Sequence, residues 1–546
     1  MAADAESDSH ADASLADAPT AEPPTSDGGG ERLASGARRV SALTMLSRLL
    51  GLAREQVFAL TLGAGMYSDA FLAAFRIPNL LRDLFAEGAL STAFVPTYVA
   101  TLRRDGRPAA QALANRVMST LTIYLGTVAL LAMIFPGPIV HLVATGFSPE
   151  KAALCARLVR VMMPFLPAIS LAVVAMGSLN AEEKYTAPAL ASSMFNLVAI
   201  GGGVTVYLLA PSSRAAVTAW AAFTVVGGIA QLAIQLPPLW HSGYRPRLIP
   251  DLRLRDPATR RIAILMAPAT LGVAAVQVNV VVNSSFASLI SDGALSWLSY
   301  AFRLMQLPIG VFGVAVGVTA LTHLSRDAAS GDWDSLSVTL RRGLRMVLFL
   351  TVPSTVGLAL LGLPIIRLIY QHGRFSPHAT LETARALSGY AVGLCAYAAI
   401  KVVVPAFYAI GRPQFPVIAS AAAVAANLLW NLLTFRRFGH VGLALGTSLA
   451  ALVNFSILAV AFHRRIHRLF TRELVVPVLK IVGASAIMAA ALWAVSSRVE
   501  LLPGAGVTIF AVKAFLPIAV GAAVYFAAAR AFGLEEARTL ISRFGR

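Results

Sequence analysis

The stretch DAFLAAFRIPNLLRDLFAEGALSTAFVP, residues 69–96, decides how the chain is interpreted. It is mostly apolar and long enough to cross a bilayer, which takes about 20 residues of helix. It also carries five charged residues, Asp69, Arg76, Arg82, Asp83 and Glu87. A charge at the bilayer centre costs ~2.5–3.5 kcal/mol on insertion scales. Charges inside a span therefore line a wet cavity, pair with one another, or lie near the interface.

The rest of the chain has the same apolar character. Of its 546 residues, 57% are hydrophobic and 13% are charged, whereas a soluble domain has about 25% charged residues. This composition excludes a large soluble enzyme and a disordered protein, and two cysteines exclude a disulfide-rich module. Residues 1–31 hold eight of the 27 acidic residues and no Lys or Arg, so the net charge rises from +18 for the whole chain to +26 for the remainder.

Apolar stretches separated by short polar breaks predict an all-α polytopic membrane protein with fourteen transmembrane helices. The expected spans are 40–62, 68–100, 113–135, 152–180, 188–210, 216–239, 262–290, 295–324, 343–369, 382–410, 414–435, 440–462, 474–497 and 507–531. Arginine-rich loops alternate with arginine-poor ones. By the positive-inside rule, both termini are therefore expected in the cytoplasm. These arginines lie in short loops between spans, which argues against nucleic-acid binding.

A weak internal repeat indicates two halves. Ala74-Phe75-Arg76 opens the second span, and Ala301-Phe302-Arg303 opens the eighth. Each would be the second span of its half, and internal repeats are common in transporters. The expected division is a disordered acidic tail (1–36), a first six-helix lobe (37–240), an inter-lobe loop (241–261), a second six-helix lobe (262–465), two further helices (466–535) and a cytoplasmic tail (536–546).

The first span adds Arg48, Arg54 and Glu55 to the charges of the second. Arg76 lies seven residues after Asp69 and seven before Asp83, so these three share one helix face, which Glu87 joins. A cavity lined by arginines suits an anionic substrate, above all phosphate or pyrophosphate. The competing interpretation is that these charges are interfacial anchors or structural ion pairs.

The charged blocks match a known family. Ser47-Arg48-Leu49-Leu50-Gly51-Leu52-Ala53-Arg54-Glu55, Phe75-Arg76-Ile77-Pro78-Asn79-Leu80-Leu81-Arg82, Phe85-Ala86-Glu87-Gly88-Ala89-Leu90-Ser91 and Ala93-Phe94-Val95-Pro96 resemble the MurJ (MviN) lipid II flippase family. The resemblance covers residues 40–531. It implies the fold of the multidrug/oligosaccharidyl-lipid/polysaccharide exporter superfamily, with two six-helix lobes around a central cavity and two extra helices. These last two helices would offer an apolar groove for the polyprenyl tail.

The resemblance also implies a function. The substrate would be lipid II, the undecaprenyl-pyrophosphate-linked peptidoglycan precursor, moved by alternating access to the outer leaflet of the bacterial inner membrane. The expected pyrophosphate-binding residues are Arg48, Arg54, Arg76, Arg82 and Arg303, and the expected gating or ion-pairing residues are Glu55, Asp69, Asp83 and Glu87. Membrane lipids and cell-wall synthesis proteins are the expected partners. Many relatives carry acids at the positions of Phe302 and Gln306, which leaves Arg303 without a counter-ion nearby in the sequence.

No catalytic set, phosphate-binding glycine loop or metal-ligand cluster occurs in the sequence, so we expect a transporter with no cofactor. Sodium or the membrane potential would then supply energy. One set of side chains could hold sodium: Asn279, Asn283, Asn427, Asn431 and Thr447. Because it lacks a carboxylate, ordinary hydrogen bonding between helices is the favoured interpretation. The alternative functions are an exporter of drugs or another polyprenyl-linked glycan, and a non-transporting cell-wall scaffold.

Overall fold

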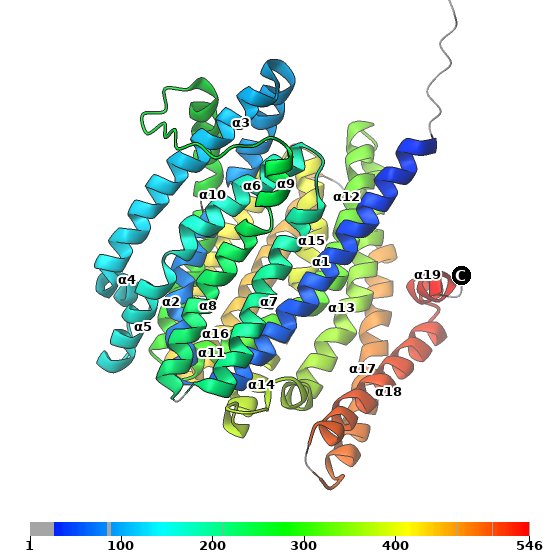
Figure 1. The fold of residues 1–546 in the computed structure, drawn as a ribbon. Coiled ribbons are helices and arrows are strands. Elements are labelled where there is room, and N and C mark those ends of the chain that lie inside the picture. The colour runs from blue at the N-terminus through cyan, green and yellow to red at the C-terminus, as the bar shows by residue number, and fades with distance from the viewer. Residues whose placement is uncertain (1–26, 85–88, 211, 467, 505, 545–546) are drawn as a thin grey trace, which may run out of the picture.

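The protein consists of long helices running side by side (Figure 1). The structure, a computed structural model, describes residues 27–84, 89–210, 212–466, 468–504 and 506–544. The helices are α1 (Asp27–Leu62), α2 (Met66–Arg82), α3 (Ala89–Ile134), α4 (Pro136–Val143), α5 (Pro149–Met162), α6 (Phe165–Ala181), α7 (Thr186–Leu209), α8 (Ser213–Ala233), α9 (Leu236–His241), α10 (Pro257–Ser288), α11 (Ala294–Pro308), the π-helical turn η2 (Ile309–Gly313), α12 (Val314–Ala329), α13 (Trp333–Tyr370), α14 (Pro377–Ala391), α15 (Leu394–Ala409), α16 (Gln414–Arg465), α17 (Arg472–Glu500), α18 (Val507–Ala531) and α19 (Glu535–Phe544).

The described part of the chain confirms the expected polytopic helical fold. Ten of its helical stretches are long and apolar enough to cross a membrane. Two helices, α3 and α16, are interrupted at Gly106 (φ +83°) and Gly439 (φ +54°), where glycine permits a left-handed backbone. Trp430 Nε1 donates to Gly442 O over 2.9 Å, so α16 folds back on itself and holds two of the expected spans. Helix lies at each of the fourteen expected ranges.

Some boundaries differ from those expected. Helix α1 begins at Asp27, inside the segment 1–36 that composition predicted to be disordered. Residues 31–34 are Glu, Arg, Leu and Ala, all strong helix formers, whereas Gly28, Gly29 and Gly30 before them are poor ones, so helix propensity accounts for only part of this extension. At the other end, α19 occupies most of the expected tail 536–546. The second and eighth spans are not uniform helices either, since each carries a proline (Pro78 and Pro308) followed by π-helical residues.

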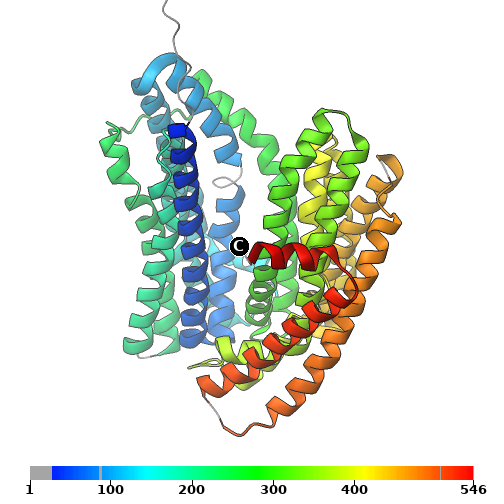
Figure 2. The ribbon, with the colours of Figure 1, turned by 90° about the vertical axis from the view of Figure 1, so that its right-hand side faces the viewer.

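Figure 2 shows the helices up to α9 on one side and α12, α13 and α15–α18 on the other. The two groups are joined at one end of the molecule. There Tyr300 Oη donates to Gly63 O over 3.0 Å, and Arg374 N donates to Leu60 O over 3.1 Å. Gly63 has a φ of +65°, and a Cβ there would overlap Arg374 O, so this close approach requires glycine.

Helices α17 and α18 pack beside α13 and enclose an apolar groove with it and α12. The groove has a volume of about 1480 Å³. Its walls include Leu350 and Leu361 of α13, Met488 and Leu492 of α17, and Phe526 of α18. Such a groove can take a long hydrocarbon chain out of water or lipid.

Candidate functional site

A polar cavity of about 920 Å³ lies where α1, α2, α6, α7, α8, α10 and α11 meet. Polar and charged side chains dominate its wall, in contrast to the apolar groove. They are Arg54, Asn79, Arg82, Asp83, Ser192, Asn196, Gln231, Gln277, Arg303 and Gln306. Three guanidinium groups from three helices therefore face one space, surrounded by amides that can donate further hydrogen bonds.

Glu55 joins two of these arginines. Its Oε1 atom lies 2.7 Å from Arg54 Nη2 and 3.1 Å from Arg303 Nη2. The Glu55 side chain is only 10% exposed, whereas that of Arg303 is 45% exposed toward the cavity. Arg54 also stacks over the ring of Phe195, with 5.3 Å from Cζ to the ring centroid. One buried carboxylate thus faces two guanidinium groups, which leaves a net positive charge beside the cavity.

The third arginine has its own neighbour. Arg82 Nη2 lies 2.9 Å from Asp83 Oδ1. The other Asp83 oxygen accepts from Gln277 Nε2 over 2.9 Å and from Asn79 Nδ2 over 3.4 Å. Gln277 belongs to α10, so this contact ties the end of α2 to the second half of the chain.

The remaining predicted arginines lie outside this cavity wall. Arg48 is exposed on α1, and its Nη1 would lie 3.5 Å from a Cβ placed at Gly310. Arg76 is half-buried on α2, and its Nε has no hydrogen-bond partner within the described ranges. Glu87 lies outside the described residues.

Asp69 lies far from the cavity, although it was expected on the same face as Asp83. The two residues are fourteen positions apart, which corresponds to about 21 Å along a helix. Asp69 is fully buried and accepts from Lys151 Nζ (2.8 Å), Gly293 N (2.7 Å) and Ser296 N (2.9 Å). It therefore caps the first turn of α11 from another helix, where the helix dipole favours negative charge.

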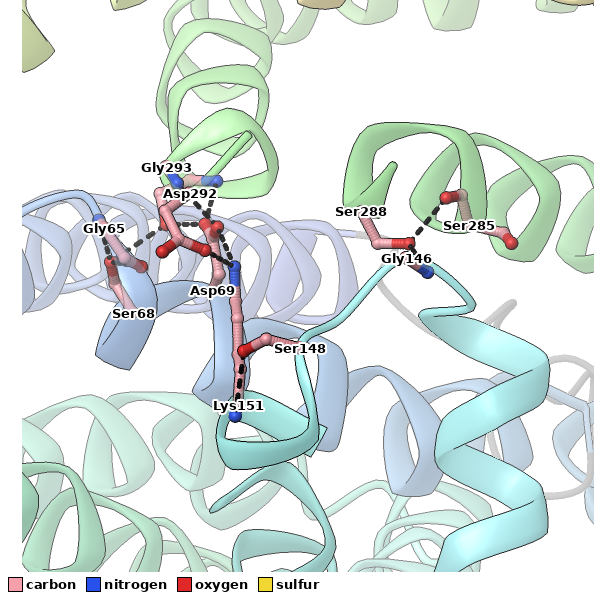
Figure 3. A network of polar contacts seen from close by, with 11 residues as sticks. Gly65, Ser68, Asp69, Gly146, Ser148, Lys151, Ser285, Ser288, Asp292 and Gly293 are labelled. Atoms are coloured by element: carbon pink, nitrogen blue, oxygen red, sulfur yellow. Dashed lines mark hydrogen bonds and ion pairs between the residues drawn. The ribbon is translucent and has the colours of Figure 1, made fainter. Parts of the chain in front are cut away.

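Lys151 completes this cluster (Figure 3). Its ammonium group also pairs with Asp292, with 2.7 Å between Nζ and Oδ1. The Lys151 side chain is 3% exposed, so it is a buried cation held between two carboxylates. Sequence reasoning assigned no role to Lys151 or Asp292. The available signal was a lysine at the edge of an apolar span in a chain with only five lysines.

The four predicted asparagines do meet, between α10 and α16. Asn427 Nδ2 donates to Asn279 Oδ1 (2.7 Å) and Asn283 Oδ1 (3.1 Å), and Asn431 Nδ2 donates to Asn283 Oδ1 (2.6 Å). Thr447 instead donates to Leu443 O over 3.0 Å. The two remaining amide oxygens, those of Asn427 and Asn431, are buried without a partner in the described part of the chain. Two oxygens fall short of the roughly six ligands that a hard cation takes.

The comparisons with known proteins point in one direction. The family model described as "Lipid II flippase MurJ" matches residues 58–512. The lipid II flippase MurJ of Burkholderia cenocepacia is 35% identical over 430 residues, which cover 78% of this chain and 83% of that protein. The probable lipid II flippase MurJ of Rhizobium tropici is 34% identical over 506 residues, covering 90% and 93% of the two chains.

Solved structures agree on the architecture. A lipid II flippase MurJ in an inward closed conformation superposes with a TM-score of 0.77 at 26% identity, covering 92% of this chain and 99% of that one. An inward-facing multidrug transporter of the MATE family superposes with a TM-score of 0.65 at 15% identity, covering 79% of this chain and 98% of that one. The second likeness concerns the fold alone.

Proposed function

The chain belongs to the MurJ family of lipid II flippases, and on that premise we propose that its polar cavity binds the pyrophosphate of lipid II during transfer to the outer leaflet. The observation that carries this proposal is the convergence of Arg54, Arg82 and Arg303 from three helices on one cavity of about 920 Å³. Guanidinium groups bind phosphate oxygens through paired hydrogen bonds, and their charge does not depend on pH.

Glu55 and Asp83 serve as internal counter-ions while the cavity is empty. An arginine left alone in a low-dielectric site is costly, so the carboxylates stabilise the unloaded protein. A pyrophosphate entering the cavity offers more negative charge than the single carboxylate between Arg54 and Arg303. The guanidinium groups then turn from Glu55 to the substrate, and Glu55 restores the original pairing when the substrate leaves.

The lipid tail would follow a separate route. The groove of about 1480 Å³ between α12, α13, α17 and α18 is apolar enough to hold polyprenyl carbon atoms. The headgroup crosses in water while the tail stays in a hydrocarbon-like environment, so neither is transferred into an unfavourable solvent. Lys480 and Lys513 on these helices donate to the backbone oxygens of Phe532 and Glu500.

Alternating access requires two lobes that move relative to each other about a region where they stay in contact. We assign the lobes to residues 37–240 and 262–465, with residues 241–261 between them and both termini in the cytoplasm. The joined end then faces the outside, where the Asp69–Lys151–Asp292 cluster holds α2, α5 and α11 together. Opening the outer side requires Asp69 to release the first turn of α11.

The charge of the cavity indicates which energy source could drive transport. One elementary charge moving through 100 mV changes free energy by ~2.3 kcal/mol, enough to bias a two-state carrier. The net positive cavity makes the membrane potential the first candidate. Sodium is the weaker candidate, because the asparagine cluster has only two amide oxygens without a partner among the described residues.

The deciding experiment measures which leaflet holds lipid II. A strain depleted of its own flippase would receive this protein, and lipid II exposed on the outer leaflet would be counted by enzymatic labelling. Restored exposure supports the proposal. Loss of exposure with Arg303→Ala, but not with Arg104→Ala on the exposed surface, would attribute transport to the cavity. Unchanged exposure with Arg303→Ala would favour a scaffold, and drug resistance without lipid II exposure would favour a drug exporter.

A further inference from the structure

The connection between α9 and α10 is bound along α3 as an extended strap, residues 244–252 (Figure 1). Its backbone is held by polar side chains on successive turns of α3 instead of by its own secondary structure. Asn115 Nδ2 donates to Arg245 O over 2.9 Å, and Asn115 Oδ1 accepts from Arg247 N over 3.0 Å. Ser119 Oγ accepts from Ile249 N over 3.1 Å.

Two further contacts hold the far end of the strap. Thr120 Oγ1 accepts from Asp251 N over 2.9 Å, and Tyr124 Oη donates to Leu252 O over 2.8 Å. These hydrogen bonds join backbone N–H and C=O groups of the strap to side chains of α3. They therefore fix how the strap lies along the helix. A segment that only connected two halves would not need this ladder of bonds.

The strap and the residues that follow it expose both apolar and basic side chains. Leu248 is 76% exposed and Leu252 is 45% exposed, although both lie outside the expected apolar spans. The arginines of this region are all exposed: Arg245, Arg247, Arg253, Arg255, Arg260 and Arg261. Exposed leucines flanked by arginines are typical of segments that lie in a membrane interface.

The two acidic residues nearby offset only part of this charge, and both also hold the backbone. Asp251 accepts from Arg255 N and Asp256 N, each over 2.9 Å. Asp256 caps α10 by accepting from Thr259 N over 2.9 Å, and it pairs with Arg116 of α3. Six arginines against two aspartates leave residues 244–261 with a net charge of +4.

The position of the strap on α3 places it beside lipid. Tyr124 is 49% exposed, and Val128 and Leu131 follow it at four and seven residues, on the same helix face, with exposures of 37% and 50%. This exposed apolar row continues from the strap into the membrane span. Tyrosine at the head of such a row is typical of the boundary between hydrocarbon and headgroups.

We propose that the strap 244–252 is an interfacial anchor that inserts Leu248 and Leu252 into the cytoplasmic leaflet, and that Arg245, Arg247 and the adjoining Arg253 bind anionic phospholipid headgroups. The argument for this occupant is charge complementarity and continuity with the lipid-facing row of α3. The anchor holds α3, and with it the first half of the chain, at a defined depth. This proposal rests on the proposed membrane orientation, with both termini in the cytoplasm. It does not depend on which substrate is transported.

The test places a probe at the tip of the strap. Full-length protein carrying Leu248→Cys, with Cys155→Ala and Cys395→Ala to remove the native thiols, is labelled with an environment-sensitive fluorophore and inserted in phosphatidylcholine nanodiscs with or without phosphatidylglycerol. Quenching by spin-labelled phosphatidylglycerol is compared with quenching by spin-labelled phosphatidylcholine. Trp333→Cys provides a control at an exposed site away from the strap.

Matched variants distinguish binding of anionic headgroups by the arginines from mere closeness of position 248 to the lipid. Each arginine near an anionic surface contributes about fivefold to local partitioning. The triple variant Arg245→Gln/Arg247→Gln/Arg253→Gln should therefore lose the preference for phosphatidylglycerol at position 248. The triple variant Arg326→Gln/Arg412→Gln/Arg464→Gln, equally exposed, should keep it. Molar salt should also abolish the preference, because the screening length falls to about 3 Å.

Three results would overturn the proposal. Strong quenching by aqueous iodide with none by either lipid would place the strap in water, as expected for a protein-docking loop. Equal quenching by both lipids would remove the role of the headgroup charge. Loss of the preference in both triple variants would show that it reflects total charge and not the strap. Elution as a single species from a sizing column would verify that each variant is folded.

Discussion

Glu55 of α1 forms an ion pair with Arg303 of α11, with 3.1 Å between Oε1 and Nη2. The two residues are far apart in the chain and belong to different halves. The same carboxylate oxygen lies 2.7 Å from Arg54 Nη2. Glu55 therefore connects the halves across the cavity and sets the charge that an incoming anion meets.

Removing that carboxylate should separate binding from transport. In Glu55→Gln, Arg54 and Arg303 lose their shared counter-ion, so lipid II should bind more tightly and leave more slowly. We expect transport to fall by about tenfold, the effect of ~1.4 kcal/mol. Lipid II affinity in detergent and outer-leaflet exposure in cells measure the two effects. Weaker binding together with slower transport would contradict ion-pair exchange at this residue.

Arg303→Ala and Arg82→Ala should abolish complementation of a flippase-depleted strain at normal protein levels. Arg303→Lys should restore only part of the activity, because an ammonium group cannot form the paired hydrogen bonds of a guanidinium. Arg104→Ala removes an arginine whose side chain is 82% exposed and should grow normally. Normal growth of Arg303→Ala would exclude its role in substrate binding.

The buried cluster predicts a stability effect. Asp69→Asn leaves Lys151 as a buried cation facing only Asp292, and breaking a buried pair costs ~3–5 kcal/mol. The double variant Asp69→Asn/Lys151→Met should recover part of that loss, because no buried unpaired charge remains and Asp292 is 66% exposed. Thermal unfolding in detergent provides the comparison. Additive losses in the double variant would mean that the two residues do not act as a pair.

The strap predicts a pH response through Asp251. Backbone hydrogen bonds from Arg255 and Asp256 lower the pKa of Asp251 below its ordinary range. A carboxyl group with a lowered folded pKa contributes stability above its unfolded pKa and loses it as pH falls through the folded value. The probe at position 248 should thus report an unchanged strap from pH 8 to about pH 5 and a looser one only below about pH 4. Asp251→Asn should loosen it at neutral pH, and a transition near pH 6 would identify a different group.

Sodium dependence tests the asparagine cluster. Since the amide groups of Asn427 and Asn431 already bond to Asn279 and Asn283, we expect transport in proteoliposomes to continue when choline replaces sodium. Asn427→Leu should lower thermal stability without changing this ion response. A large loss of transport in choline, removed by Asn427→Leu, would instead assign the cluster to cation binding.

Much of the membrane architecture was predictable because hydropathy is local. Helix occurs within each of the fourteen expected ranges, as far as the structure describes them, and the break in α16 at Gly439 lies between two of them. The start of α1 was not predictable from composition, since the acidic, glycine-containing segment resembles a disordered tail. Likewise, Arg54, Arg82 and Arg303 could be singled out because a charge inside an apolar span needs a reason.

The sequence by itself determined the membrane-spanning class, the positions of the spans and the small set of charges that lie within them. Only the tertiary structure decided which of these charges meet. Helical periodicity places a residue on a face of its own helix, but the identity of the facing residue depends on how distant segments pack. For that reason Asp83 lies at the cavity while Asp69, on the same helix, faces Lys151 and the first turn of α11. The counter-ion of Arg303 is likewise Glu55, which no spacing in the sequence could have identified.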